Sequence, residues 1–205
     1  GNLFIHPKTG KILICDNDNV SIDGDPSTII GTPGFMAPEI ARGEASPSTE
    51  TDLFSLAVLL FHLLYRHHPL EGDLFYSYLT IDDAYHSLFA ENPIYIFDPD
   101  NDANRPVIGK QDTPIMYHKY YPEYLKSLFE RSFTTGLKPG GRIRETEWRA
   151  AMIRLRDMIV PCDTCRKENF FDVHAAKSCW KCSRTITPPA RINIEGTVVS
   201  LPKGR

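Results

Sequence analysis

The sequence predicts a mainly helical domain with a small β-hairpin at its start, followed by a small β unit built around cysteines. Two segments before position 160 carry apolar residues at helical spacing, and a third is apolar nearly all round. Beyond that point the short β-prone runs RINIEG and TVVSL replace the helical pattern. Four of the five cysteines lie in this second part: Cys162, Cys165, Cys179 and Cys182. We therefore expect two domains, residues 1–160 and 161–205.

Composition and charge agree with this division. A chain of 205 residues with 41% hydrophobic and 24% charged residues can build one full core and a small additional domain. From Pro161 onward there are eight Lys or Arg and four Asp or Glu, against 15 and 22 before it, so the tail is about +4 and the body about −7 by this count. Different charges indicate two units with different surfaces.

No export or membrane signal is visible. The longest apolar run, residues 53–64, has twelve residues, whereas a bilayer span needs roughly 18. The N-terminus also lacks the charged-then-apolar layout of a signal peptide. We expect a soluble, cytoplasmic protein without a membrane partner.

The first elements are short. Residues 2–5 and 11–14 are apolar runs joined by HPKTG, whose Pro and Gly favour a turn, so a hairpin is predicted. Its second strand leads into the acidic segment ICDNDNV. The later stretch GTPGFMAPEI has two prolines and two glycines, which argue against a long regular element and for an ordered loop.

Helices account for most of the remaining first domain. A capping-box-like start at Thr49–Asp52 opens a helix over about 51–65 that should lie in the middle of the domain. Another helix is predicted over about 81–90, before the long loop NPIYIFDPDNDANRP. Two further helices carry one buried stripe each, and Pro161 closes the second of them. The stripes are Leu125, Leu128, Phe129 and Phe133, then Trp148, Met152, Leu155 and Ile159.

The acidic segment admits two interpretations on its own. In a calcium loop, Asp16 and Asp18 would be the first and third ligands of an EF-hand, but that pattern requires Gly at the sixth position and Glu at the twelfth. Here those positions hold Ser21 and Ser27, which excludes the EF-hand. A polar turn after a buried strand remains as the alternative to a metal-binding role.

The order of the motifs resembles the second half of a protein kinase catalytic domain. Asn2 lies fourteen residues before Asp16, and GTPGFMAPE ends at Glu39, twenty-three residues after it. The resemblance implies that Asn2 matches the catalytic-loop Asn and Asp16 the Asp of the Asp-Phe-Gly motif, so that both hold the magnesium of Mg-ATP. Residues 37–39 then match the Ala-Pro-Glu motif that closes the activation segment, and Thr32 lies near the substrate hydroxyl.

Two more positions extend this resemblance over residues 1–160. Asp52, followed by LFSLAVLLF, resembles the Asp that opens the central kinase helix, where a buried carboxylate caps N–H groups of the catalytic loop. Arg142, in LKPGGRIRETEW, resembles the Arg whose fork pairs with the Ala-Pro-Glu glutamate, here Glu39. Both roles are structural. The implied fold is the helical C-terminal lobe of a protein kinase.

The departures from the family pattern are as informative. The chain reads Asp16-Asn17-Asp18 where the family has Asp-Phe-Gly, so switching by a flip of the Phe is not expected. It begins one residue before the matching Asn, without the catalytic-loop Asp, the strand Lys or the glycine-rich loop. We therefore expect no catalytic residue in these 205 residues and no kinase activity from them alone.

The spacing C-x2-C-x13-C-x2-C predicts a structural zinc site. Two thiolate pairs on tight turns offer four soft ligands to a tetrahedral ion, and four Cys ligands leave no open position for catalysis. Paired disulfides or free thiols are the alternatives. Trp180 is interpreted as packing for this zinc ribbon, and His67 and His68 as the solvated end of the central helix. The basic residues of the tail are scattered, so nucleic acid is not an expected partner.

The combination of ICDNDNV, GTPGFMAPEI, NPIYIFDPDNDANRP and a four-Cys ribbon resembles bacterial kinase-like proteins of tellurite-resistance and stress loci. That resemblance implies association with a von Willebrand factor type A protein and a phosphatase. Two hypotheses follow. In the first, the chain is part of a Ser/Thr kinase; in the second, it is a docking module for a partner such as the von Willebrand factor type A protein. The two roles are compatible, since a kinase can dock through its C-terminal lobe. For these 205 residues we favour docking.

Overall fold

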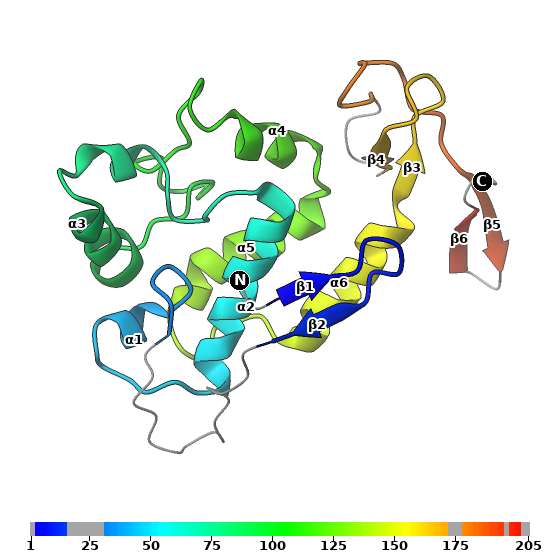
Figure 1. Cartoon of the computed structure of the whole chain (residues 1–205). Coiled ribbons are helices and arrows are strands. Elements are labelled where there is room, and N and C mark those ends of the chain that lie inside the picture. The colour runs from blue at the N-terminus through cyan, green and yellow to red at the C-terminus, as the bar shows by residue number, and fades with distance from the viewer. Residues whose placement is uncertain (1–2, 16–30, 172–177, 195–196, 202–205) are drawn as a thin grey trace.

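The computed structural model describes residues 3–15, 31–171, 178–194 and 197–201, and this part of the chain is mainly helical with small β-hairpins, as expected (Figure 1). The α-helices are α1 (Pro38–Ala41), α2 (Thr49–Tyr65), α3 (Ile81–Tyr85), α4 (Asp112–Tyr120), α5 (Glu123–Phe133) and α6 (Glu145–Asp157). Short 3₁₀ turns cover Asp73–Ser77 and Thr135–Leu137, and a π-helix covers His86–Glu91. None of the described helices combines the length and apolar character needed to cross a membrane.

Helix α2 is central, as its all-round apolar character predicts (Figure 1). It begins with a capping box in which Ser48 accepts from the Thr51 N–H and the Thr51 side chain accepts from the Ser48 N–H, so the cap lies one residue earlier than expected. Its Phe61 stacks on Tyr65 at 4.1 Å and meets the Phe129 ring of α5 edge-on at 5.1 Å. This aromatic contact joins α2 to α5 in the core.

Helices α5 and α6, each predicted from a stripe of apolar residues, are both present, with two corrections to α6. Leu125, Phe129 and Phe133 of α5 are fully buried. In α6 the stripe ends early, because the helix stops at Asp157 and Ile159 lies in strand β3, where 37% of it is exposed. Pro161 belongs to the same strand and does not end the helix.

The segment between α2 and α4 contains the predicted helix, since α3 and the π-helix together span residues 81–91. The long loop that follows is fastened by Asn104, which is fully buried. Its amide donates to Leu70 O (2.9 Å) and Ile94 O (2.7 Å), and its Oδ1 accepts from the N–H of Gly72 (3.1 Å). A Cβ at Gly72 would lie 1.8 Å from Asn104 O, so this close approach requires glycine. Helix α4, which follows this loop, was not predicted.

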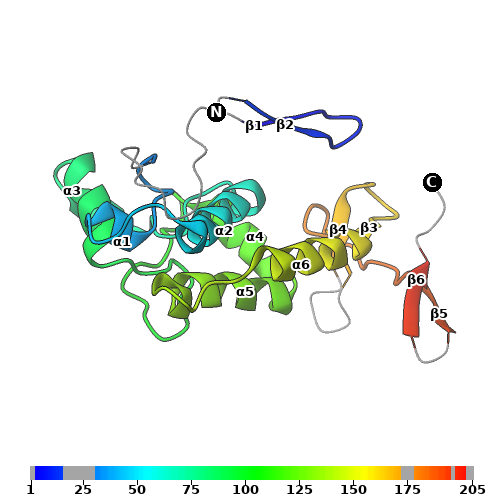
Figure 2. The ribbon, with the colours of Figure 1, turned by 90° about the horizontal axis from the view of Figure 1, so that it is seen from below.

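In the described part of the chain the strands form three antiparallel pairs: β1 (Leu3–Ile5) with β2 (Ile12–Ile14), β3 (Ile159–Pro161) with β4 (Glu168–Phe170), and β5 (Ala190–Ile194) with β6 (Thr197–Leu201). The predicted first hairpin is therefore present, with Leu3 opposite Ile14. Its strands are not buried, because Ile14 is 61% exposed and the hairpin stands beside the helices rather than among them (Figure 2). The interpretation of β2 as a buried strand is wrong for these residues.

The second half of the described chain contains a separate small core. Val160, Cys162, Cys179 and Ile186 are buried together there. We call residues 159–171 and 178–189 the Cys unit, and residues 31–157 the helical unit. The Cys unit follows the end of α6 (Figure 1) and remains tied to it, since Phe171 N donates to Met158 O at 2.8 Å. The domain boundary at residue 160 stays a prediction, and β3 crosses it.

Candidate functional site

Residues 31–41 form an ordered loop that ends in α1, and we call it the anchored loop. Arg142 fastens its end, because Nη2 of Arg142 donates to both carboxylate oxygens of Glu39 at 2.6 and 2.8 Å. The two side chains are only 2% and 9% exposed. Arg142 also donates to Glu50 O (2.9 Å), at the start of α2. One guanidinium nitrogen thus bonds both carboxylate oxygens in a buried, charge-assisted pair, and such hydrogen bonds are stronger than neutral ones.

Two more side chains hold the middle of the anchored loop. The Ser55 hydroxyl of α2 donates to Phe35 O at 2.7 Å. Nε2 of His68 donates to Gly34 O at 2.8 Å, and its Nδ1 accepts from Leu70 N at 3.1 Å, which fixes the neutral Nε2–H tautomer. Burial lowers the pKa of His68 to about 3, outweighing the hydrogen bond to Gly34 O that favours the charged form.

The interpretation of His67 and His68 as solvated residues is therefore wrong. His68 is 4% exposed because it lies between α2 and the anchored loop, with its ring 4.3 Å from that of Phe89. His67 is half-buried and bonds Glu71 O at 2.7 Å. Sequence reasoning also gave no role to Ser55. The sequence gives little sign of this role, because a Ser inside an apolar helix is expected to bond a carbonyl of the preceding helical turn. The carbonyl that Ser55 bonds at 2.7 Å, Phe35 O, instead lies 20 residues earlier.

The other expected site residues are distributed as follows. Thr32 is exposed at the start of the anchored loop, and its carbonyl accepts from Phe35 N at 3.0 Å. Asp52 is exposed in the first turn of α2 rather than buried, and the catalytic-loop Asn expected near it, Asn2, lies outside the described residues. Asp16 also lies outside them, so both magnesium ligands stay predictions.

The four cysteines of the tail come together in the Cys unit. All four Sγ atoms lie within 4.8 Å of one another. Cys162 and Cys182 approach to 3.7 Å, and Cys165 and Cys179 to 3.6 Å. A disulfide needs about 2.05 Å. Four sulfurs at about 2.3 Å from a tetrahedral zinc ion lie roughly 3.8 Å apart, so the spacing fits a closed metal site better than disulfides.

Two turns of the same geometry carry these cysteines. In the first, Cys162 N donates to Lys167 O (2.9 Å) and Arg166 N to Cys162 O (2.9 Å). The second repeats this with Cys179 N to Arg184 O (2.8 Å) and Ser183 N to Cys179 O (2.9 Å). The residue after each second cysteine, Arg166 or Ser183, has φ 59°. Each C-x2-C pair is thus presented by a tight turn with a left-handed residue.

Polar groups around the sulfurs favour thiolates at two positions. Burial opposes ionisation of Cys179, but the N–H groups of Cys182 and Lys181, with the Asn169 amide, lower its pKa to about 6. The N–H of Cys165 lowers the pKa of Cys162. At Cys182 the N–H of Arg184 acts in the same direction, but burial and the neighbouring thiols raise the pKa to about 11. Holding all four sulfurs as thiolates this close together would need a cation between them, which zinc would supply.

Comparison with known proteins places these features in context. The protein kinase domain family matches residues 1–105. The chain is 36% identical over 75 residues to a probable serine/threonine-protein kinase, CCRP1, of Zea mays, covering 35% of this chain and 12% of that protein. It is 28% identical over 142 residues to the protein kinase C delta type of Mus musculus, covering 60% and 19%. The yeast protein kinase C-like 1 of Saccharomyces cerevisiae is 31% identical over 101 residues, covering 47% and 8%. The chain thus spans less than a fifth of the length of these relatives.

Proposed function

This chain belongs to the protein kinase domain family, and from that premise we propose that it forms the substrate-side part of a Ser/Thr protein kinase-like signalling protein that docks a partner protein. The observation that carries the proposal is the anchored loop. Three side chains distant in sequence hold it from separate elements: Ser55 and His68 bond its backbone carbonyls, and Arg142 bonds the Glu39 side chain. A loop held this firmly, with Thr32 exposed at its start, suits the positioning of a polypeptide.

Docking is the role proposed for these 205 residues. The partner is a von Willebrand factor type A protein, with a phosphatase as a further member of the same assembly, in the cytoplasm of a bacterium. What supports this is the combination of a kinase-like helical unit and a four-Cys tail, which resembles kinase-like proteins of tellurite-resistance and stress loci. The Cys unit binds one structural zinc ion through Cys162, Cys165, Cys179 and Cys182, and the sulfur spacing supports this ligand set.

The alternative role is catalytic. In a longer protein that supplies a catalytic-loop Asp and a nucleotide-binding lobe, Asn2 and Asp16 would hold Mg-ATP and the anchored loop would present the substrate hydroxyl near Thr32. This role predicts phosphate transfer that is lost in Asp16→Ala. Docking alone predicts that Asp16→Ala leaves partner binding unchanged.

Native mass spectrometry tests the docking role. The zinc-loaded chain is mixed with a candidate von Willebrand factor type A protein, and complex mass and bound zinc are read together. A one-to-one complex carrying one zinc is expected. If the partner stays free, the docking role fails. If the sulfurs are found as disulfides without zinc, the metal assignment fails.

A further inference from the structure

A cavity of about 460 Å³ lies between the helical unit and the Cys unit. Tyr117, Tyr120 and Tyr121, at the end of α4, line one side, and Phe170 and Trp180 of the Cys unit line the other. The volume falls in the range typical of ligand sites. Five aromatic side chains from two units therefore surround a space large enough for a bound side chain and its neighbours.

Both walls of this cavity are held in place. On the Cys unit, Trp180 N donates to Asn169 Oδ1 at 3.1 Å, and the indole Nε1 donates to Glu168 O at 2.8 Å. On the helical unit, the Tyr121 hydroxyl donates to Leu64 O at 2.7 Å. The Tyr121 and Phe170 rings meet at 5.3 Å, which ties the two walls together. A cavity fixed in this way is formed before a ligand arrives, so binding needs little reorganisation.

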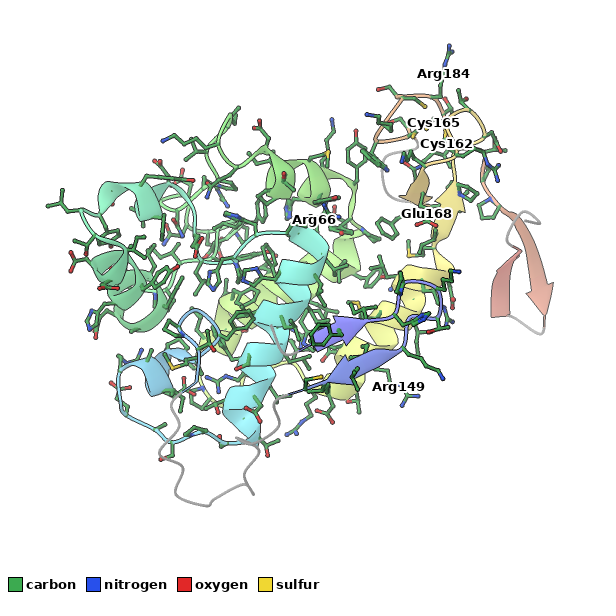
Figure 3. The ribbon with its side chains drawn as sticks, in the orientation of Figure 1. Arg66, Arg149, Cys162, Cys165, Glu168 and Arg184 are labelled. Carbon is green, nitrogen blue, oxygen red and sulfur yellow. The ribbon has the colours of Figure 1, made fainter. Side chains whose placement is uncertain are left out.

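Trp180 thus has a second use besides packing. It is half-buried and lines the cavity while its polar groups are bonded to the Cys unit. Its position depends on the second cysteine turn, because it lies between Cys179 and Cys182. Figure 3 shows Cys162 and Cys165 toward the tip of the Cys unit, with Glu168 nearer the helices. The metal site would therefore support the cavity wall without taking part in it.

The charged residues of the cavity favour an anionic ligand of limited size. Arg166 and Lys167 are exposed beside it, against one acid, Glu168. The segment from Pro161 onward, which includes most of the Cys unit, is also the basic part of the chain, at about +4 by formal count. A single-stranded nucleic acid would need basic side chains following its phosphates over several nucleotides. Two basic residues and one acid suit a short acidic peptide better.

We propose that this cavity binds an acidic peptide segment of a partner protein. An aromatic side chain of the peptide enters among Tyr117, Tyr120 and Trp180, and a neighbouring carboxylate pairs with Arg166 or Lys167. The inference rests on the proposed docking role and names the chemistry of the partner's contact segment. Aromatic anchors surrounded by aromatic walls are the usual source of affinity in such contacts.

Fluorescence anisotropy of labelled peptides on the zinc-loaded chain tests this. The probe is a short fluorescein-labelled peptide with one Phe between Asp and Glu residues, compared with the same peptide carrying Ala for Phe and with one carrying Lys and Arg for the acids. The acidic Phe peptide is expected to bind at least about tenfold tighter than either, a difference of about 1.4 kcal/mol. Equal binding of all three peptides overturns the proposal.

Substitutions locate the binding. Lys167→Glu is expected to weaken the acidic Phe peptide about tenfold, and Tyr120→Ala to abolish the preference for Phe. The matched control Arg149→Glu makes the same charge change on an exposed residue of α6 that does not line the cavity (Figure 3), and it should bind as the unsubstituted chain does. Circular dichroism and zinc content verify folding of each variant. Equal losses in Lys167→Glu and Arg149→Glu overturn the proposal.

Failure of this inference is distinguishable from failure of the docking role. If the partner complex survives Lys167→Glu and no acidic peptide binds, docking stands and the cavity proposal is overturned. If the peptide binds as described and the von Willebrand factor type A protein does not, the cavity proposal stands and the partner is different. An oligothymidylate that binds with the same dependence on Lys167, in place of the peptide, overturns the proposal in favour of nucleic acid.

Discussion

Replacing Arg142 by Met tests how much the buried Arg142–Glu39 pair, which we call the clamp on the anchored loop, contributes to the unfolding free energy. The substitution leaves the Glu39 carboxylate buried without its two charged hydrogen bonds, and it removes the donor to Glu50 O. Loss of one partner of a buried pair costs about 3–5 kcal/mol of unfolding free energy. The Arg131–Glu147 pair is the matched control, because its distance is similar (2.7 Å) while its side chains are 53% and 44% exposed. There Arg131→Met should cost less than about 1 kcal/mol.

The assay is urea unfolding of the zinc-loaded chain, followed by the helical circular dichroism signal, with the denaturant dependence compared between variants. The double variant Glu39→Met with Arg142→Met removes both charges, so it should cost less than the sum of the two single variants. If Arg142→Met lowers the unfolding free energy no more than Arg131→Met does, the clamp does not stabilise the fold. If the single costs simply add in the double variant, the two side chains are not coupled as the clamp requires.

Three further predictions concern burial, pH and zinc. Tyr95→Phe should raise the unfolding free energy by about 1 kcal/mol, because the buried Tyr95 hydroxyl has no hydrogen-bond partner among the described residues. Tyr121→Phe should lower the unfolding free energy by a similar amount, because it removes the hydrogen bond to Leu64 O, and thermal unfolding compares the two variants. The folded pKa of His68 is about 3 and its ordinary value is 6.5, so between these pH values the unfolded chain binds a proton that the folded chain does not. The unfolding free energy should therefore fall by up to about 1.4 kcal/mol per pH unit as the pH drops through this window. Urea unfolding at several pH values should show a flatter pH profile for His68→Gln than for the unsubstituted chain. Cys179→Ser should lose zinc, whereas Cys15→Ser should keep it, because Cys15 is not among the four clustered sulfurs. Elemental analysis measures the zinc, and equal zinc content in the two variants would contradict the ligand set.

The sequence predicted the helices in which apolar residues recur at helical spacing or cover nearly the whole surface. The stripe of α5 and the apolar surface of α2 survive in the structure because burial of a helix face depends mainly on its own spacing. Helix α4 was missed because its sequence DTPIMYHKY has no clear apolar stripe, and only one residue in it, Pro114, is buried. The exposure of β2 could not be read from its apolar residues, since burial depends on what packs against a strand.

Residues that act at long range were the least predictable part of the site. His68 reads as the polar end of a helix, yet it is buried because the anchored loop, 34 residues earlier, returns to cover it. Asn104 lies in an acidic loop sequence, and nothing local indicates that it would bond carbonyls 10 and 34 residues away. The Glu39–Arg142 contact was expected only through the family resemblance, because spacing alone cannot relate positions 103 apart. The magnesium roles of Asn2 and Asp16 stay predictions.

That separation of 103 positions also has a kinetic consequence. Closing so long a loop costs conformational entropy before the contact gains anything, so the pair should form after the local helical contacts and be largely absent from the folding transition state. A contact of this kind governs how fast the native state opens and has little effect on how fast it forms. The Arg142–Glu39 clamp should therefore mainly slow unfolding, so it determines how long the anchored loop stays ordered as well as which shape it has.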